Sequence, residues 1–256
     1  MQEGLTVKAL STELRTGLAF LTRLPLVPAV AASGTDISRA SWTFPVIGAG
    51  IGALGAIVYA IGHGFSLPPL VCATLAVMST LVLTGALHED GLADTADGFG
   101  GGTTQERKLE IMRDSRIGTY GASALILSMV LRVGAIASLG EPALAAAALI
   151  AANAGARAAL PVFMRGVERA RPDGLAAEAG APPQSSAGIA LLIGLAIVWL
   201  CLGFGAMLLA LVLGGALLFA MAWLSTNQVG GQTGDVLGAV EQACEILILL
   251  VAAARL

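Results

Sequence analysis

Stretches of about 20 mostly apolar residues recur along the chain, and they constrain its fold more than any other feature. A helix needs roughly this length of apolar sequence to cross the hydrocarbon core of a bilayer. The C-terminal stretch starts polar at Asp235 and ends apolar, so it is either a further span or a half-buried helix. The clear stretches are Phe44–Gly62, Pro69–Leu87, Gly118–Leu139, Pro142–Phe163 and Ala187–Leu224, the last being long enough for two spans that turn near Gly203.

The supply of charged residues is too small for a water-exposed surface. Charged residues make up 12% of the chain and hydrophobic residues 56%, whereas a soluble domain typically carries about 25% charged residues. The net charge of −3 argues against a nucleic-acid partner, which requires a basic surface. We therefore predict an all-α fold: a polytopic membrane helix bundle with about six or seven transmembrane helices, in a single integral-membrane domain over residues 1–256.

The N-terminal segment is amphipathic, because Leu10, Leu14, Leu18 and Leu21 fall on one face if it is helical. This spacing suits a helix that lies in the membrane interface, and an ordinary packed helix explains it equally well. We take the interfacial helix as the prediction.

The 33 glycines also suit a membrane bundle, because small residues let helices approach closely. Gly48 and Gly52 form one such pair. The segment Gly50–Gly55 matches the dinucleotide-binding pattern G-x-G-x-x-G. It lies inside an apolar stretch, with no preceding strand and no acidic residue about 20 positions later, so we interpret it as helix packing.

Lysine and arginine predict the orientation. They gather in the segments 1–43, 88–117 and 164–186, and the turns near 63–68, 140–141 and 203–205 contain none. Because positive loops stay in the cytoplasm, we predict a bacterial cytoplasmic (inner) membrane protein whose long loops face the cytoplasm. Nearly all acidic residues fall on the same side, which therefore carries the chemistry.

The densest polar feature is the segment from His88 to Gly98. If it is helical, Asp90, Asp94 and Asp97 stand at positions i, i+4 and i+7 and share one face. Three carboxylates in one row repel one another unless a cation is bound between them. Oxygen ligands of this kind suit Mg²⁺, which binds through a few carboxylates together with substrate phosphates. A solvated polar face is the alternative.

A glycine-rich segment, Phe99–Thr104, follows the acidic motif. We expect a flexible loop in which the backbone at Gly100 and Gly101 approaches a phosphate, although such loops are often plain turns.

Beyond this loop, Glu106, Glu110 and Asp114 recur every four residues and are surrounded by basic residues. Carboxylates with nearby cations are what diphosphate transfer needs, and i,i+4 ion pairs on a surface helix are the alternative. The basic residues are Arg107, Lys108, Arg113 and Arg116.

Two further polar segments lie on the same predicted side. Arg169–Leu175 is a basic turn, and Gly230–Glu241 ends with acidic residues that enter the last apolar helix. We expect Asp235 to be an N-cap, the commoner role of a single aspartate before a helix. His88 adjoins the acidic motif and could orient a carboxylate.

Two families resemble the chain. Asp94–Gly98, with the spaced acids that follow, loosely resembles the signature of CDP-alcohol phosphotransferases, but Gly101 and Gly102 stand where that signature has Ala-Arg. The whole chain resembles the cobalamin synthase (adenosylcobinamide-GDP ribazoletransferase) family more closely. The segments that carry this resemblance are Phe20–Pro25, Phe44–Gly48, His88–Gly98, Leu109–Gly121 and Thr233–Ala239, with a weaker likeness at Arg171–Leu175.

The second resemblance implies a Mg²⁺-dependent transferase with one catalytic domain. Such an enzyme joins adenosylcobinamide-GDP, a corrinoid-GDP, to α-ribazole or its 5′-phosphate, and releases GMP with adenosylcobalamin or its 5′-phosphate. The partners are these small molecules and the lipid membrane. The sequence leaves open the oligomeric state (a homo-oligomer included), the number of metal ions, the preferred ribazole and the general base.

Roles for individual residues follow as hypotheses. Asp90, Asp94, Asp97 and Asp114 hold one or two Mg²⁺ ions. Glu110 or one of those aspartates accepts the proton of the attacking hydroxyl, and Arg113 or Arg116 stabilises the departing GMP. Arg107, Arg171, Gly100 and Gly101 bind the substrate phosphates. The rival classes are a phospholipid-forming CDP-alcohol phosphotransferase and an ion-coupled transporter, whose polar residues usually lie near the membrane midplane.

Overall fold

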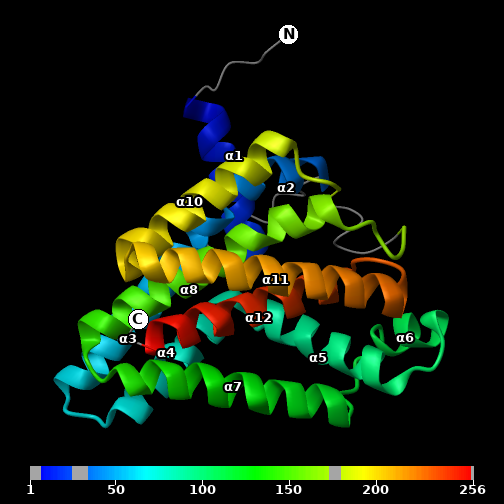
Figure 1. Cartoon of the computed structure of the whole chain (residues 1–256). Coiled ribbons are helices and arrows are strands. Elements are labelled where there is room, and N and C mark those ends of the chain that lie inside the picture. Colours follow the sequence, from blue (N-terminus) through cyan, green and yellow to red (C-terminus); the bar gives the residue numbers. More distant parts are fainter. Residues whose placement is uncertain (1–6, 25–33, 173–179, 255–256) are drawn as a thin grey trace.

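The computed structural model of the chain describes residues 7–24, 34–172 and 180–254, and within these ranges it is a bundle of helices without a strand (Figure 1). The predicted all-α fold is therefore confirmed. The helices are α1 (Val7–Leu21), α2 (Gly34–Ala40), α3 (Phe44–Gly64), α4 (Pro69–Thr84), α5 (Leu87–Gly101), α6 (Gln105–Ile111), α7 (Thr119–Leu139), α8 (Pro142–Gly166), α10 (Gln184–Leu202), α11 (Phe204–Val229) and α12 (Gly234–Ala253), with one 3₁₀ turn, η1 (Ser41–Thr43).

Within the described residues, six helices are long and apolar enough to cross a membrane: α3 with the residues before it, α7, α8, α10, α11 and α12. A seventh span results if α4 and α5 count as one broken span. The predicted six or seven spans are confirmed. The division of the long apolar stretch at Gly203 is confirmed too, and α12 is one of the six, so the C-terminal stretch is long enough to span.

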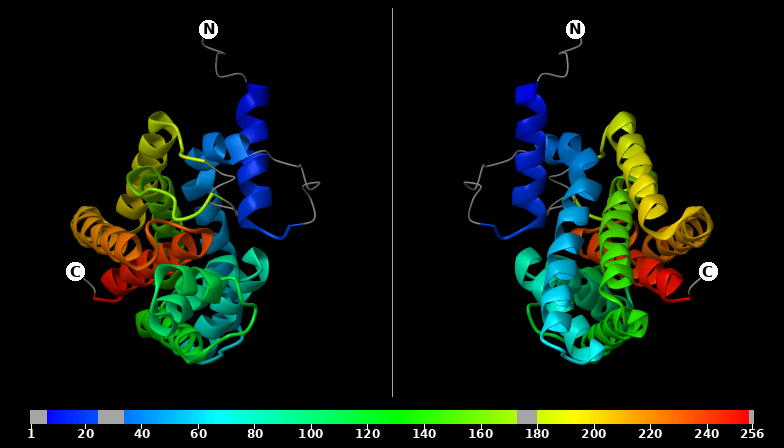
Figure 2. Two further views of the ribbon diagram at one scale, coloured as in Figure 1. Left: turned by 90° about the vertical axis from the view of Figure 1, so that its right-hand side faces the viewer. Right: turned by 90° about the vertical axis from the view of Figure 1, so that its left-hand side faces the viewer.

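The connections sort to opposite sides of the bundle. In Figure 1 the α3–α4, α7–α8 and α10–α11 connections lie on the left, and α6 lies on the right with the junction of α11 and α12. Figure 2 shows α1 extending beyond the rest of the bundle. On α1, Leu21 is fully buried and Leu14 is 42% exposed, so the leucine face is only partly covered. The interfacial position of α1 stays a prediction.

Helix α8 packs against α3, α10 and α12 in the middle of the bundle. A Cβ atom on Gly48 or Gly52 of α3 would collide with the backbone of Asn153 or Leu149 on α8. The predicted close approach at these two glycines is confirmed. The segment Gly50–Gly55 lies inside α3, and its Gly52 and Gly55 pack against neighbouring helices, which confirms that the pattern belongs to a packed helix. Gly50 itself has nothing within 4 Å of its Cβ position.

The second apolar stretch ends earlier than predicted. Helix α4 stops at Thr84 rather than Leu87, because Gly85 and Ala86 both adopt left-handed backbone conformations with φ of 68° and 56°. Helix α5 then leaves at 90° to α4. The Arg23 side chain lies 2.6 Å from the Cβ position of Gly85, so a larger residue there would displace it. The bend places the acidic motif on a helix of its own.

Candidate active site

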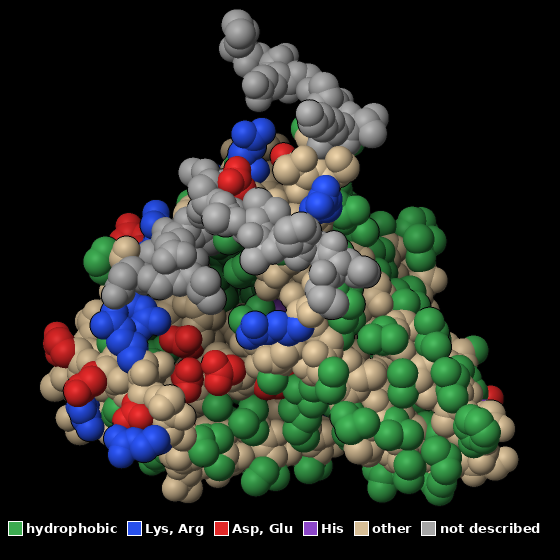
Figure 3. Space-filling view, turned by 180° about the vertical axis from the view of Figure 1, so that it is seen from behind, with side chains coloured by type: hydrophobic (Ala, Val, Ile, Leu, Met, Phe, Trp, Pro, Cys, Tyr) green, Lys and Arg blue, Asp and Glu red, His purple; other side chains and the backbone are tan. Residues whose placement is uncertain are grey.

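The acidic motif is helical, as predicted. Asp90, Asp94 and Asp97 lie on successive turns of α5, and their exposure falls along it: Asp90 is exposed, Asp94 half-buried and Asp97 buried. Figure 3 shows acidic side chains gathered beside lysine and arginine side chains on one part of the surface, with hydrophobic side chains over most of the remainder. The motif thus runs from solvent into the bundle.

Asp235 at the start of α12 joins this set. Partial burial disfavours the charged form of Asp94 most, the carboxylates of Asp90, Asp235 and Asp97 add to this effect, and Arg171 opposes it. Arg171 Nη2 donates to Asp235 Oδ2 at 3.3 Å. The expectation that Asp235 is the N-cap is wrong, because Thr233 takes that position and its Oγ1 accepts from the backbone N–H of Val236 at 3.2 Å. We call Asp90, Asp94 and Asp235 the acidic set.

Glycines bring α5 and α12 together at the acidic set. The Cβ position of Gly91 lies 2.8 Å from the carbonyl oxygen of Asp235, and that of Gly238 lies 2.9 Å from the carbonyl oxygen of His88. Real Cβ atoms do not approach other atoms so closely, so a side chain at either position would force the two helices apart. The separation of Asp94 from Asp235 therefore depends on these glycines.

Asp97 serves the neighbouring helix. Its Oδ2 accepts from the backbone N–H of Gly118 at 2.7 Å, and its Oδ1 accepts from that of Gly121 at 2.8 Å. These amides form the N-terminus of α7, where a negative charge interacts favourably with the helix dipole. Both carboxylate oxygens are thus engaged in tying α5 to α7. The predicted role of Asp97 in metal binding and catalysis stays a prediction.

The residues around α6 form ion pairs on the surface. Arg107 Nη1 lies 2.6 Å from Glu110 Oε2, and Arg116 Nη2 lies 2.6 Å from Asp114 Oδ2. Hydrogen bonds from the Arg116 side chain and backbone lower the pKa of Asp114 to about 2. The sequence had left the choice between ion pairs and a catalytic cluster open, and this geometry favours ion pairs for these four residues.

The positive charge of Arg113 acts weakly on Asp235, less than that of Arg171 does. Of the basic residues predicted for the site, the structure therefore relates Arg171 and Arg113 to the acidic set. Arg107 and Arg116 are paired with acidic neighbours on α6 and the turn after it.

The prediction of a glycine loop is wrong for residues 99–101, which are helical. Phe99, Gly100 and Gly101 belong to the last turn of α5, and the extended residue Gly102 follows the helix. The Cβ position of Gly100 lies 2.6 Å from the Tyr120 ring, so this glycine allows α5 to pack closely on α7. Phosphate binding by Gly100 and Gly101 stays a prediction.

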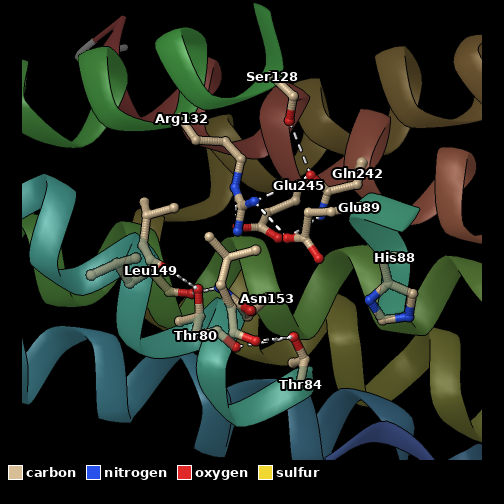
Figure 4. A network of polar contacts seen from close by, with 12 residues as sticks. Thr80, Thr84, His88, Glu89, Ser128, Arg132, Leu149, Asn153, Gln242 and Glu245 are labelled. Carbon is tan, nitrogen blue, oxygen red and sulfur yellow. Dashed lines mark hydrogen bonds and ion pairs between the residues drawn. The ribbon is translucent and has the colours of Figure 1, made fainter. Parts of the chain in front are cut away.

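A buried polar network that the sequence analysis missed joins α5, α7 and α12 (Figure 4). Arg132 on α7, Arg157 on α8 and Glu245 on α12 lie inside apolar stretches of the sequence. Their partners come from helices that are distant in the sequence, such as Glu89 and Glu245 for Arg132. The available signal was the presence of ionisable residues inside predicted spans, which is costly in a membrane and generally functional.

The acidic set suits magnesium only together with a substrate. Among the described residues, no group of three or more His, Cys, Asp or Glu side chains converges tightly enough to hold a metal alone. The set nevertheless offers only oxygen donors of like charge. Mg²⁺ commonly binds through one or two carboxylates and completes its shell with water and substrate phosphates. The donors therefore fit a magnesium ion shared with a phosphorylated substrate.

These features define a class: a multi-pass helical membrane protein with an acidic site between α5 and α12 at one end of its bundle. The chain belongs to the cobalamin-5-phosphate synthase family, whose model matches residues 13–253. This confirms the closer of the two resemblances found in the sequence.

Curated relatives cover nearly the whole chain. An adenosylcobinamide-GDP ribazoletransferase of Bradyrhizobium diazoefficiens is 52% identical over 97% of this chain and 96% of its own length. Proteins of the same name from Mesorhizobium japonicum and Azorhizobium caulinodans are each 48% identical over 93% of this chain, covering 92% and 94% of their own lengths. No solved structure matches the chain.

Proposed function

We propose that the chain is a Mg²⁺-dependent transferase that joins adenosylcobinamide-GDP to α-ribazole or α-ribazole 5′-phosphate. The products are adenosylcobalamin, or its 5′-phosphate, and GMP. The names of the relatives support the pair of substrates. The observation that carries the proposal is the acidic set, where the charges of Asp90 and Asp235 act on Asp94 and the guanidinium of Arg171 lies beside Asp235. Such a site attracts a divalent cation together with a diphosphate.

The acidic set provides the ligands for the metal in this proposal. A bound Mg²⁺ would neutralise the phosphate oxygens of the GDP moiety and stabilise the charge that develops on them during transfer. Asp90, Asp94 and Asp235 would hold it. We do not include Asp97 and Asp114 among these ligands, although the sequence predicted them. Backbone amides of α7 hydrogen-bond to Asp97, and Arg116 forms an ion pair with Asp114.

The chain's other residues bind the substrate and move the proton. The ribazole hydroxyl oxygen forms a bond to the phosphorus that carries the corrinoid, the bond to the bridging oxygen breaks, and GMP leaves with the bonding electrons. Arg171, which lies beside Asp235, and Arg113, whose charge acts on Asp235, would stabilise the leaving phosphate. Glu110, or one of the sequence-predicted aspartates that does not bind the metal, takes the hydroxyl proton.

The site faces the cytoplasm of a bacterial inner membrane in this proposal. Lysines and arginines concentrate on the segments at the end of the bundle that holds α6 and the start of α12. The turns at the opposite end contain no lysine or arginine. Positive segments are retained in the cytoplasm, where nucleotide-activated substrates are made available.

A turnover assay with purified protein in lipid tests the proposal. Adenosylcobinamide-GDP and Mg²⁺ are supplied with either form of ribazole, and GMP and corrinoid products are measured. We expect product only with Mg²⁺, and loss of turnover by about 100-fold or more in Asp94→Asn, because the acidic set loses a metal ligand. Glu141→Gln, an exposed carboxylate in the α7–α8 turn, is the matched control and should retain activity. Full activity of Asp94→Asn, or turnover of a CDP-linked substrate instead, would overturn the proposal.

A further inference from the structure

Charged side chains lie buried between helices of a bundle that is otherwise apolar. At most 7% of any of their side chains is exposed. Ionisable groups at such depth are costly in a membrane and persist where they serve a function. They come from four helices: Glu89 on α5, Arg132 on α7, Arg157 on α8, and Glu241 and Glu245 on α12.

Arg132 lies at the centre of this network and joins α5 to α12. Its Nη1 is 2.7 Å from Glu89 Oε1, and its Nη2 is 3.0 Å from Glu245 Oε1 (Figure 4). Gln242 on α12 closes the arrangement, because its Nε2 donates to Glu89 Oε1 at 3.1 Å and its Oε1 accepts from Arg132 Nη1 at 3.2 Å. Ser128 Oγ donates to the same amide oxygen at 3.0 Å. One guanidinium thus bridges two helices from a third.

Arg157 forms a second connection to the same two helices. Its Nη1 is 2.7 Å from Glu241 Oε1 on α12 and also donates to the side-chain oxygen of Asn153 at 2.9 Å. The other oxygen of Glu241 lies 3.3 Å from His88 Nδ1 on α5. The network therefore connects α5 and α12 both through Arg132 of α7 and through Arg157 of α8.

The network and the acidic set lie on the same two helices, α5 and α12, at neighbouring positions. Glu89 directly precedes Asp90, and Gln242 and Glu245 follow Asp235 by about two and three helical turns. Gly91, which follows Glu89 by two residues on α5, forms the close contact with Asp235 on α12. Any rotation or shift of α5 on α12 at the network therefore changes the separation of Asp94 from Asp235.

We propose that Arg132 is a positioning residue: its guanidinium, bridging Glu89 and Glu245, fixes α5 on α12 so that Asp94 and Asp235 share one divalent cation. Stability alone explains the network poorly, because a buried ion pair contributes little or nothing compared with well-packed apolar residues. The fork of the guanidinium contacts both carboxylates at once, a geometry that an ammonium cannot reproduce. The inference rests on the proposed function for its metal.

The test compares Arg132→Lys with Leu139→Ala in the purified full-length protein in lipid nanodiscs. Lysine keeps the charge but loses the two-carboxylate bridge. Leu139 is on the same helix, is 4% exposed and packs in an apolar cluster outside the network, so its truncation reports general destabilisation. Binding of Mn²⁺, as a substitute for Mg²⁺, is measured by electron paramagnetic resonance with adenosylcobinamide-GDP present and ribazole omitted, so that the substrate diphosphate completes the metal shell. Thermal unfolding is measured on the same samples.

We expect Arg132→Lys to bind Mn²⁺ about tenfold or more weakly, the usual effect of losing a residue that orients metal ligands. Leu139→Ala should keep the wild-type affinity even where it unfolds at a lower temperature. Glu89→Gln, which weakens the bridge from the other side, should resemble Arg132→Lys and serves if that variant does not fold. Wild-type affinity in both network variants overturns the inference, and so does a wild-type protein that binds no Mn²⁺. If the wild type binds Mn²⁺ but forms no transfer product, the proposed function fails while the Mn²⁺ comparison still decides the role of Arg132.

Discussion

Asp94 in the acidic motif and Asp114 after α6 were both predicted to bind the metal, but the charges around them differ. The strongest charges acting on Asp94 include three other carboxylates, opposed by Arg171. Asp114 instead accepts hydrogen bonds from the Arg116 side chain at 3.0 and 2.6 Å and is partly exposed. A cation that binds near Asp94 relieves repulsion, whereas at Asp114 it would compete with an arginine already in place. Asp94 is therefore the stronger candidate for a metal ligand.

Asp97 provides a residue-scale test of the division between metal binding and structure. In Asp97→Asn, the two amides at the start of α7 lose a charged acceptor, so we expect the free energy of unfolding to fall by about 1–3 kcal/mol. The Mn²⁺ affinity should stay near that of the wild type. Thermal unfolding and Mn²⁺ binding are measured side by side with Asp94→Asn. An unchanged unfolding temperature with a loss of Mn²⁺ affinity as large as in Asp94→Asn would make Asp97 a metal ligand.

At the scale of elements, periodicity and hydropathy predicted the spans because each depends on a residue's immediate neighbours along the chain. The bend after Thr84 was missed, since the positive φ of Ala86 depends on packing rather than on residue type. The partners of Arg132 were missed for a related reason: Glu245 is 113 positions away, and hydropathy treats each span in isolation. The acidic motif was recognisable because its carboxylates lie within one helix.

The contact between α5 and α12 is tested by Gly91→Ala. The new methyl group would lie 2.8 Å from the Asp235 carbonyl oxygen, so the helices must separate. We expect turnover to fall at least about tenfold and the Mg²⁺ concentration for half-maximal turnover to rise, because the carboxylates of the acidic set move apart. Gly134→Ala on α7 is the matched control, as nothing lies within 4 Å of its Cβ position. Equal behaviour of the two variants in the transfer assay would show that the close contact has no part in catalysis.

For the whole molecule, orientation in the membrane decides which compartment supplies the substrates. The acidic set, α6 and the preceding glycine segment share one end of the bundle, and the turns without lysine or arginine share the other. Because positive segments are retained in the cytoplasm, we predict that the acidic set faces the cytoplasm. A corrinoid linked to GDP is too large and too polar to cross the bundle, so the site must open to the side where this substrate is made.

Cysteine labelling in cells tests this orientation directly. Cys72, Cys201 and Cys244 are first replaced by alanine, and a single cysteine is then introduced by Ser66→Cys in the α3–α4 turn or by Ser115→Cys before α7, both exposed positions. A membrane-impermeant maleimide should label the Ser66→Cys protein in intact spheroplasts and the Ser115→Cys protein only in inverted vesicles. Labelling after detergent treatment controls for the reactivity of each thiol, and retained turnover shows that each variant is folded. The opposite labelling pattern would place the acidic set outside the cytoplasm, where a nucleotide-activated substrate is not made, and would contradict the proposed reaction as well as the orientation.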